Sequence, residues 1–361
     1  MDGGTQPAAQ EERRLAFSFS GNSWDYFKIC LRTYLLAILT LGIYDAWGSV
    51  ERRRYLLGHT KLDGHGFDYH AKPWVILLAR LIVLAFIVDI AIFSQIWPAP
   101  TAISAVAVLV LLTPWIINSA YRFQLRNTSY RTLRFDFRGS YFQALWRYVL
   151  IGPLVMIPTL GLAYPWVVKL RATYAGDHMR YGEAPFSMNI RIMPVFWILL
   201  ISYAVFIALF VVAILVVGIT AAAMSVDWDA APQDVMVQLD FTEAGFNILF
   251  LIIVTTLSGV IRGAVRKAVL LGASLEGGHR FESTLRPWRY GVFVMVSWLA
   301  TVVTGGLAGP WATVRIRRYE LDSTAMLSNG DLDGFTGKER DAGEAVGAEI
   351  GVLEGLAGAG F

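Results

Sequence analysis

Long apolar runs alternate along this chain with short segments rich in arginine. A helix that crosses about 30 Å of hydrocarbon needs roughly 20 residues, because it rises about 1.5 Å per residue. The runs that reach or approach this length are 74–96, 102–117, 195–224 and 244–261. We therefore predict an all-α, polytopic helical membrane protein in which these four runs span the bilayer.

Three further apolar runs are interrupted by glycine or proline. Each contains the tripeptide Thr-Leu-Gly or Thr-Gly-Gly, at 40–42, 159–161 and 304–306. Broken backbone is tolerated at membrane depth only where it is buried in protein or lines a wet cavity. Two interpretations stay open. Either these runs are re-entrant or half-inserted segments in the inner leaflet, or they are three further crossings, which makes seven.

A repeated pattern links the apolar runs to the arginine-rich segments. A Trp is followed by an aromatic residue after eight positions, by a polar pair after twelve and thirteen, and by a Phe after twenty. The first copy consists of Trp47, Tyr55, His59, Thr60 and Phe67. Further copies begin at Trp115, Trp166, Trp311 and, in a weaker form, Ile261, and the last one loses the pattern after Thr324. The four Trp residues are expected to be interfacial anchors.

A short strand is indicated before the first broken run. The phrase Phe17-Ser-Phe19-Ser-Gly21 alternates apolar and polar residues, and a similar phrase at 135–139 precedes the second broken run. The expected fold class stays all-α.

The distribution of positive charge predicts the orientation. The connections at 97–100 and 225–243 contain no Lys or Arg, whereas the other connections are basic. Because Lys and Arg near span ends are retained in the cytoplasm, these two connections are expected outside, with the basic loops and the C-terminal tail inside. Seven simple crossings would divide the basic residues about evenly between the two sides. This favours broken runs that enter and leave on one side, with seven crossings as the alternative.

Composition also indicates a membrane protein. Hydrophobic residues make up 55% of the 361 residues and charged residues 16%, against about a quarter charged in soluble domains. The net charge of +3 conceals a segregation, because acidic residues concentrate in the Gly/Ala-rich C-terminal segment. We expect a disordered N-terminus at 1–14, a membrane domain with repeated units at 15–320 and a disordered acidic tail at 321–361.

The first copy of the repeat resembles a known family. Its run TLGIYDAW, followed by RRRY, HT, LDG and FDY, is similar to the YjgN family of bacterial inner-membrane proteins, and the likeness covers most of residues 15–320. The resemblance implies a multi-pass protein of the bacterial cytoplasmic (inner) membrane. It implies no catalytic assignment, since the function of the family is unassigned. The acidic tail does not resemble the family pattern.

Arginines close to the repeated Trp residues are candidates for contact with anionic lipid headgroups. Each basic residue near an anionic leaflet contributes about 1 kcal/mol of attraction, although topological anchoring and snorkelling also explain such residues. The candidates are Arg52, Arg53, Arg54, Arg122, Arg126, Arg171, Arg315, Arg317 and Arg318. Membrane lipids are therefore the expected partners, and a homo-oligomer or an envelope protein partner stays open. Nucleic acid is not expected, because the basic residues lie at span ends.

The sequence contains no motif for catalysis. It has no G-x-S-x-G, Walker or dinucleotide-binding pattern, and its one cysteine, Cys30, has no paired motif. His65 and His70, with Asp63 and Asp68, are possible metal ligands, but Asp63-Gly64 is first a turn sequence and the other copies lack this set. We expect no enzyme activity, no metal and no cofactor.

Asp89 and Arg80 form the candidate intramembrane site. Asp89 lies fifteen residues into the run 74–96, whereas Arg80 is close enough to the inner interface to snorkel. An acid inside a span is a functional-site candidate, with a structural hydrogen bond or a place near the outer headgroups as the alternative. The leading hypothesis is a channel- or transporter-like bundle. The alternative is a membrane scaffold or regulator that binds anionic lipid or an envelope partner through its aromatic-basic repeats.

Overall fold

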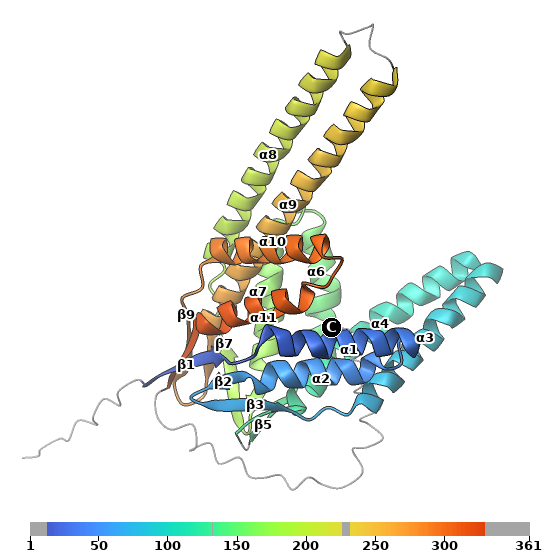
Figure 1. Cartoon of the computed structure of the whole chain (residues 1–361). Helices are drawn as coiled ribbons and strands as arrows, with labels where there is room; N and C mark the ends of the chain where they lie inside the picture. The colour runs from blue at the N-terminus through green and yellow to red at the C-terminus, as the bar shows by residue number, and fades with distance from the viewer. Residues whose placement is uncertain (1–12, 132, 226–231, 329–361) are drawn as a thin grey trace, which may run out of the picture. The chain divides into compact units, whose positions relative to one another are not determined.

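The computed structural model describes residues 13–131, 133–225 and 232–328 (Figure 1). The elements of the first part are β1 (Arg13–Phe19), α1 (Ser23–Leu39), α2 (Asp45–Gly58), β2 (Thr60–Leu62), β3 (His65–Tyr69), α3 (Pro73–Ile96), α4 (Pro98–Arg126), β4 (Thr128–Tyr130) and β5 (Leu133–Phe137). The middle part contains α5 (Tyr141–Ala144), the π-helical turn η1 (Leu145–Leu150), α6 (Ile151–Met156), α7 (Tyr164–Asp177), β6 (Met179–Tyr181) and β7 (Ala184–Met188). The last part contains α8 (Met193–Ser225), α9 (Pro232–Gly272), β8 (Ala273–Leu275), β9 (His279–Ser283), α10 (Pro287–Val303), α11 (Gly309–Asp322) and β10 (Thr324–Ser328).

Contacts divide the chain into two units. The first unit comprises 1–190, 269–284 and 317–361, and it contains all ten strands. The second comprises 191–268 and 285–316, and the elements described in it are helices.

Ten short strands form a closed antiparallel barrel, so the expected all-α fold class is wrong. The order around the barrel is β1, β10, β9, β8, β7, β6, β5, β4, β3, β2 and back to β1. Apart from the seven residues of β1, the strands have three or five residues. Runs this short carry almost no periodicity of their own, but closure pairs each of them on both sides and leaves no edge.

The sequence repeat corresponds to a strand–helix–helix–strand unit that occurs five times. The units are β1–α1–α2–β2, β3–α3–α4–β4, β5–α5–η1–α6–α7–β6, β7–α8–α9–β8 and β9–α10–α11–β10. After the second helix, each of the first four units is followed by two strands that form a hairpin, whereas α11 is followed by β10 alone. The strand β1 pairs with β10 in place of the missing strand, and it also pairs with β2. The first and last strands thus close the ring.

The polar pair of the repeat lies where the second helix of a unit ends and a strand begins. The hydroxyl groups of Thr60, Thr128 and Thr324 donate to the carbonyl four residues earlier at 2.7–2.8 Å. The Nδ1 atoms of His59 and His178 also lie 2.8 Å from the carbonyl four residues earlier. Carbonyls at a helix end lack amide partners, so these side chains cap the helix.

The aromatic residue eight positions after the Trp holds the start of the unit. The Tyr55 hydroxyl accepts a hydrogen bond from the Asn22 amide at 2.8 Å and donates to the Asn22 carbonyl at 2.9 Å. The Tyr174 hydroxyl donates in the same way to the Ser140 carbonyl at 3.0 Å. A Cβ atom at Gly139 would overlap this Tyr174 hydroxyl. Glycine is therefore required where the chain leaves β5.

The Thr-Leu-Gly and Thr-Gly-Gly tripeptides turn three helical pairs back on themselves. In the first, Leu41 and Gly42 have φ angles of 52° and 90°, and the Thr40 hydroxyl accepts from the Tyr44 amide at 2.9 Å. The turns at 159–161 and 304–306 have the same pair of positive φ angles and the same hydroxyl contact. Positive φ lies outside the right-handed helical region, so each broken run is a helical hairpin and not one straight helix.

In the contact unit made of 191–268 and 285–316, glycines allow close contact between α9 and α10. A Cβ atom at Gly259 would lie 2.8 Å from the Cα of Gly291, and one at Gly291 would lie 2.8 Å from the Thr256 carbonyl oxygen. Small residues let helix backbones approach in this way.

Both segments expected to be disordered overlap barrel strands at their inner ends. The strand β1 begins at Arg13, and β10 runs from Thr324 to Ser328. Residues 321 and 322 of the expected tail belong to the end of α11. The expectations for residues 1–12 and 329–361 fall outside the described residues.

Candidate membrane-binding site

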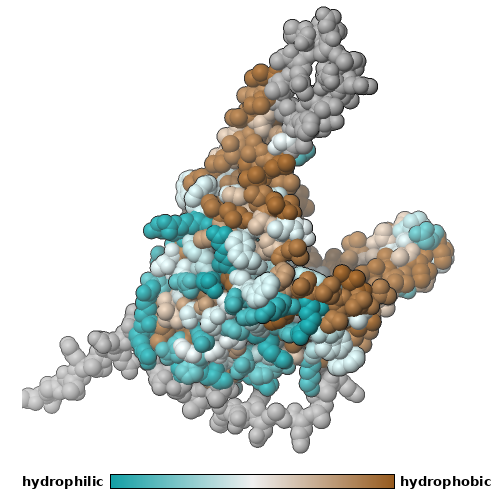
Figure 2. All heavy atoms as spheres, viewed as in Figure 1, coloured by the Kyte–Doolittle hydropathy of each residue, from teal (hydrophilic) through white to brown (hydrophobic). Residues whose placement is uncertain are grey.

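Four helical segments are long and apolar enough, by length and composition, to cross a membrane. They are Pro73–Ile96, Pro98–Arg126, Met193–Val216 and Gly245–Gly272, in α3, α4, α8 and α9. Many of their large apolar side chains are exposed. Figure 2 shows hydrophobic surface along the pair α3–α4 and along the pair α8–α9. Exposed apolar surface of this extent marks contact with lipid or with another protein.

The helices join the barrel at one end. The tight turns that follow β2, β4, β6 and β8 lie at the other end of the strands. Each long pair, α3–α4 and α8–α9, therefore leaves the barrel and returns to it. The 24 residues of α3 reach about 36 Å at about 1.5 Å per residue, so α3 is long enough to carry the turn at Trp97 across the hydrocarbon core of a membrane.

The three short helical pairs, α1–α2, α6–α7 and α10–α11, expose apolar residues at their turns. Leu41 is 94% exposed and Leu160 is 84% exposed. Val303 and Leu307 are exposed at the third turn. We call the residues around 41, 160 and 305 the hairpin tips. Leaving a leucine in water costs about 1.5–3 kcal/mol relative to burying it, so the tips are candidates for lipid contact.

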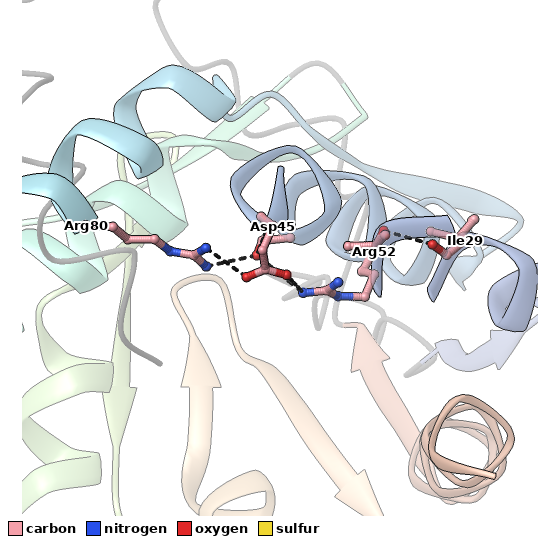
Figure 3. Close-up of polar contacts among 6 residues, drawn as sticks. Ile29, Asp45, Arg52 and Arg80 are labelled. Atoms are coloured by element: carbon pink, nitrogen blue, oxygen red, sulfur yellow. Dashed lines mark hydrogen bonds and ion pairs between the residues drawn. The ribbon is translucent and has the colours of Figure 1, made fainter. Parts of the chain in front are cut away.

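A cluster of charged and polar side chains joins the first short pair to α3 (Figure 3). Asp45, at the start of α2, accepts a hydrogen bond from Arg80 of α3 at 2.7 Å and one from Arg52 of α2 at 3.0 Å. The Ser49 hydroxyl oxygen accepts from the same two guanidinium groups at 3.2 and 3.4 Å. We call these four residues the Asp45 cluster. Two guanidinium groups and one carboxylate give it a net charge of +1.

The charges of the Asp45 cluster are not fully matched. Burial by itself would raise the pKa of Asp45, but the hydrogen bonds and positive charges of Arg52 and Arg80 outweigh it and hold the pKa below its usual range. The carboxylate is therefore ionised at neutral pH. The Nη1 atom of Arg52 is buried, and no described residue accepts a hydrogen bond from it. A guanidinium group binds phosphate oxygens strongly, and the side chains of Arg52 and Arg80 are 21% and 31% exposed.

Most of the other candidate arginines bond to the protein itself. Their partners are Tyr69 for Arg53 and Arg54, Asp136 for Arg126, Tyr148 for Arg171, the Phe293 and Trp311 rings for Arg315, Glu320 for Arg317 and the Gly21 carbonyl for Arg318. Arg122 is half-buried on α4. Such contacts are those of structural arginines, and headgroup binding by these residues stays a prediction.

Asp89 and Arg80 do not pair. Arg80 turns to Asp45, whereas Asp89 is exposed on α3 and makes no hydrogen bond or ion pair with the described residues. A functional role for Asp89 stays a prediction.

The four repeated Trp residues have different surroundings. The ring of Trp47 packs edge-on against Trp74, with ring centres 4.8 Å apart, and Trp115 is half-buried on α4. Trp166 and Trp311 are 40% and 39% exposed. Their role as interfacial anchors stays a prediction.

The histidines named as possible metal ligands have other partners. The Nε2 atom of His70 lies 2.8 Å from the Ser129 hydroxyl, and the Nδ1 atom of His65 lies 2.9 Å from the Asp63 carbonyl. Across the described ranges, no three His, Cys, Asp or Glu residues are grouped so that they could hold a metal ion.

Sequence reasoning missed Asp45 and Ser49. Asp45 lies two residues before Trp47, where other copies have Thr113, Tyr164 and Gly309, so comparison of the copies does not single it out. The available signal was its place at the start of a helix, where the helix dipole favours an acid. That signal predicts a helix start and says nothing of Arg80, 35 residues further along the chain.

Comparison with known proteins gives one family and three relatives. A family described as a bacterial protein of unknown function (DUF898) matches residues 14–353. The relatives are three proteins called inner membrane protein YjgN, from Salmonella typhimurium strain LT2, Escherichia coli O157:H7 and Escherichia coli K12. They are 28–29% identical over 147–151 residues, which is 40–41% of this chain and 37% of each relative. No solved structure matches this chain.

Proposed function

Because this chain belongs to the DUF898 family of bacterial proteins of unknown function, we propose a function from its architecture. It is a multi-pass inner-membrane scaffold that holds its barrel at the cytoplasmic face and binds anionic lipid headgroups there. The resemblance to the YjgN family is confirmed by the relatives' names. Those names and the four apolar helices support an inner-membrane location.

The observation that carries the proposal is the exposure of the hairpin tips. Leu41 and Leu160 are almost fully exposed at turns whose neighbours are also apolar. Moving two large apolar side chains per tip from water into acyl chains contributes about 3–6 kcal/mol. The Asp45 cluster lies at the start of the helix that follows the first tip, where its arginines would meet phosphate groups. In this arrangement four helices cross the membrane and the three short pairs enter one leaflet.

The charge distribution supports a cytoplasmic barrel. The sequence has no Lys or Arg between Arg80 and Arg122, nor between Arg191 and Arg262. The far ends of the two long pairs therefore carry no positive charge, whereas the ends that join the barrel do. Positively charged loops are retained in the cytoplasm, so the barrel is expected inside.

The test measures the depth of the tips in the membrane. In a Cys30→Ser background, cysteine replaces Leu41 or Leu160, and the full chain is reconstituted with a nitroxide label in vesicles of phosphatidylethanolamine and phosphatidylglycerol. We expect both labels to collide with oxygen and to be shielded from a water-soluble nickel complex. Glu183→Cys, on the exposed turn between β6 and β7, is the control and should show the reverse. Tip labels with the accessibility of the control would contradict the proposal.

Asp89 favours transport as a second candidate function. A carboxylate deep in a span is costly, and such residues often bind cations or relay protons. The barrel does not favour passage of an ion, because its core cluster is apolar apart from two tyrosine hydroxyls that already bond to the backbone. A transport path would therefore follow α3, which carries Asp89, and a measurement of flux with Asp89→Asn tests it.

A further inference from the structure

Five equivalent pairs of side chains line the inside of the barrel. Each pair joins the first and last strands of one repeat unit. In four units the pair contains the Phe that lies twenty residues after the first position of a copy of the sequence repeat. In the first unit, β1–α1–α2–β2, Phe17 occupies the corresponding place. The pairs are Phe17 with Leu62, Phe67 with Tyr130, Phe135 with Tyr181, Phe186 with Leu275 and Phe281 with Met326. The repeated Phe is thus a barrel-lining residue.

These ten residues and Met179 enclose a cavity of about 220 Å³. The aromatic rings pack along the wall: Phe67 lies on Tyr130 with ring centres 4.8 Å apart, and Phe135 on Tyr181 at 5.0 Å. A barrel of about eight strands is just wide enough for side chains to fill. Ten strands with side chains that pack along the wall leave the centre open.

The apolar lining favours a hydrocarbon ligand over a polar one. The two tyrosines are its only residues with polar side-chain atoms, and their hydroxyls already donate to the backbone carbonyls of Leu62 at 2.8 Å and of Tyr130 at 3.0 Å. A polar molecule would leave its water partners and find few replacements. An apolar cavity of about 150 Å³ in another protein stays dry and binds benzene. The barrel therefore has room for a larger apolar group.

We infer that the barrel is a binding site for the hydrocarbon chain of a lipid, with an unbranched acyl chain as its occupant. The inference rests on the proposed function, which places the helix-bearing end of the barrel at the membrane surface. Met179, the first residue of β6 directly after α7, lines the cavity, so the cavity extends toward that end. The chain can belong to a free fatty acid or to a phospholipid, since the buried chemistry is the same.

The experiment uses the full chain in vesicles of phosphatidylethanolamine and phosphatidylglycerol. One arm contains a fatty acid with a diazirine at the end of its chain, and the other contains phosphatidylethanolamine with the same diazirine on one tail. After irradiation, labelled peptides are identified by mass spectrometry. We expect adducts on the barrel peptides that contain Phe67, Tyr130 or Phe135, in addition to adducts on the long helices. Barrel adducts from the phospholipid identify its tail as the occupant, and barrel adducts from the fatty acid alone identify the free acid.

Two filling variants and one control test the site itself. Phe135→Trp and Leu62→Phe each add volume at a different strand of the lining, and each is expected to lower barrel labelling about tenfold, because overpacking a filled cavity is unfavourable. The use of two strands separates filling from a local folding defect. Phe142→Trp makes the first exchange at a residue of α5 that is 77% exposed and should leave barrel labelling unchanged.

The outcomes separate this inference from the proposed function. Adducts confined to the helices, or equal barrel labelling in the parent and both filling variants, would overturn the acyl-chain site while leaving the membrane scaffold intact. An absence of adducts from helices and barrel alike would contradict both.

Discussion

Replacing Asp45 by asparagine tests whether the Asp45 cluster binds lipid or only fastens α2 to α3. The carboxylate lies 2.7 Å from Arg80 and 3.0 Å from Arg52, so both guanidinium groups lose their shared counter-charge while the side-chain size hardly changes. The net charge of the cluster rises from +1 to +2. One positive charge beside an anionic surface is worth about 1 kcal/mol, which is about fivefold in affinity.

The same change should weaken the fold. A hydrogen bond to a charged group contributes about 1.5–3 kcal/mol when buried, and this is discounted here because the three side chains are 21–31% exposed. We expect Asp45→Asn to lower the free energy of unfolding by about 1–2 kcal/mol. Tighter binding of anionic lipid by a less stable protein is a combination that a purely structural cluster would not produce.

The assay is a titration of the full chain in detergent with phosphatidylglycerol or phosphatidylcholine, followed by native mass spectrometry, with the melting temperature measured in parallel. Asp25→Asn is the matched control. It removes the same charge from an exposed pair on α1, where Lys28 lies 3.1 Å away, and should change neither quantity much. Unchanged or weaker phosphatidylglycerol binding by folded Asp45→Asn, relative to this control, would refute the reasoning.

Three other predictions follow from individual residues. Gly139→Ala should lower the free energy of unfolding by about 2–4 kcal/mol, because its methyl group overlaps the bonded Tyr174 hydroxyl. The control Gly58→Ala, with open space around it, should be neutral. Equal melting temperatures of the two variants would contradict this. Burial lowers the pKa of His279, so the unfolded chain takes up a proton first and stability should fall as the pH drops below about 6.5. His279→Asn should flatten that dependence in thermal melts between about pH 5 and 8, and an unaltered slope would rule the residue out as its source. Asp89→Asn should preserve expression and abolish pH- or ion-dependent flux in proteoliposomes if α3 carries a transport path, and normal flux would remove that role.

The repeat could be recognised in the sequence because its residues interact with residues close to them along the chain. His59 and Thr60 bond to carbonyls within their own helix, and Gly42 stands at a positive φ angle that the turn requires. Capping and turn chemistry act over a few residues, so each copy displays the same pattern. The long apolar runs were readable for the same reason, since a spanning helix is defined by the length of its own hydrophobic stretch.

The barrel was not predicted, although one hairpin signal was present. Asp63 and Gly64 both have positive φ angles, as in the Asp-Gly turns that join adjacent strands. The strands on either side, β2 and β3, have three and five residues, too few for alternation to be distinguished from a loop. The strand phrase at 17–21 was recognised, but nothing in it indicates that β1 also pairs with residues 325–328.

Sequence alone therefore determined which runs are apolar enough to meet lipid and that a pattern recurs, because each of these is a property of neighbouring residues. Tertiary structure alone decided that β1 closes the ring by pairing with both β10 and β2, that the repeated Phe residues surround one cavity and that Arg80 pairs with Asp45 and not with Asp89. Those contacts join residues that are far apart along the chain, and their free energy depends on closure of the whole ring, which no single segment contains.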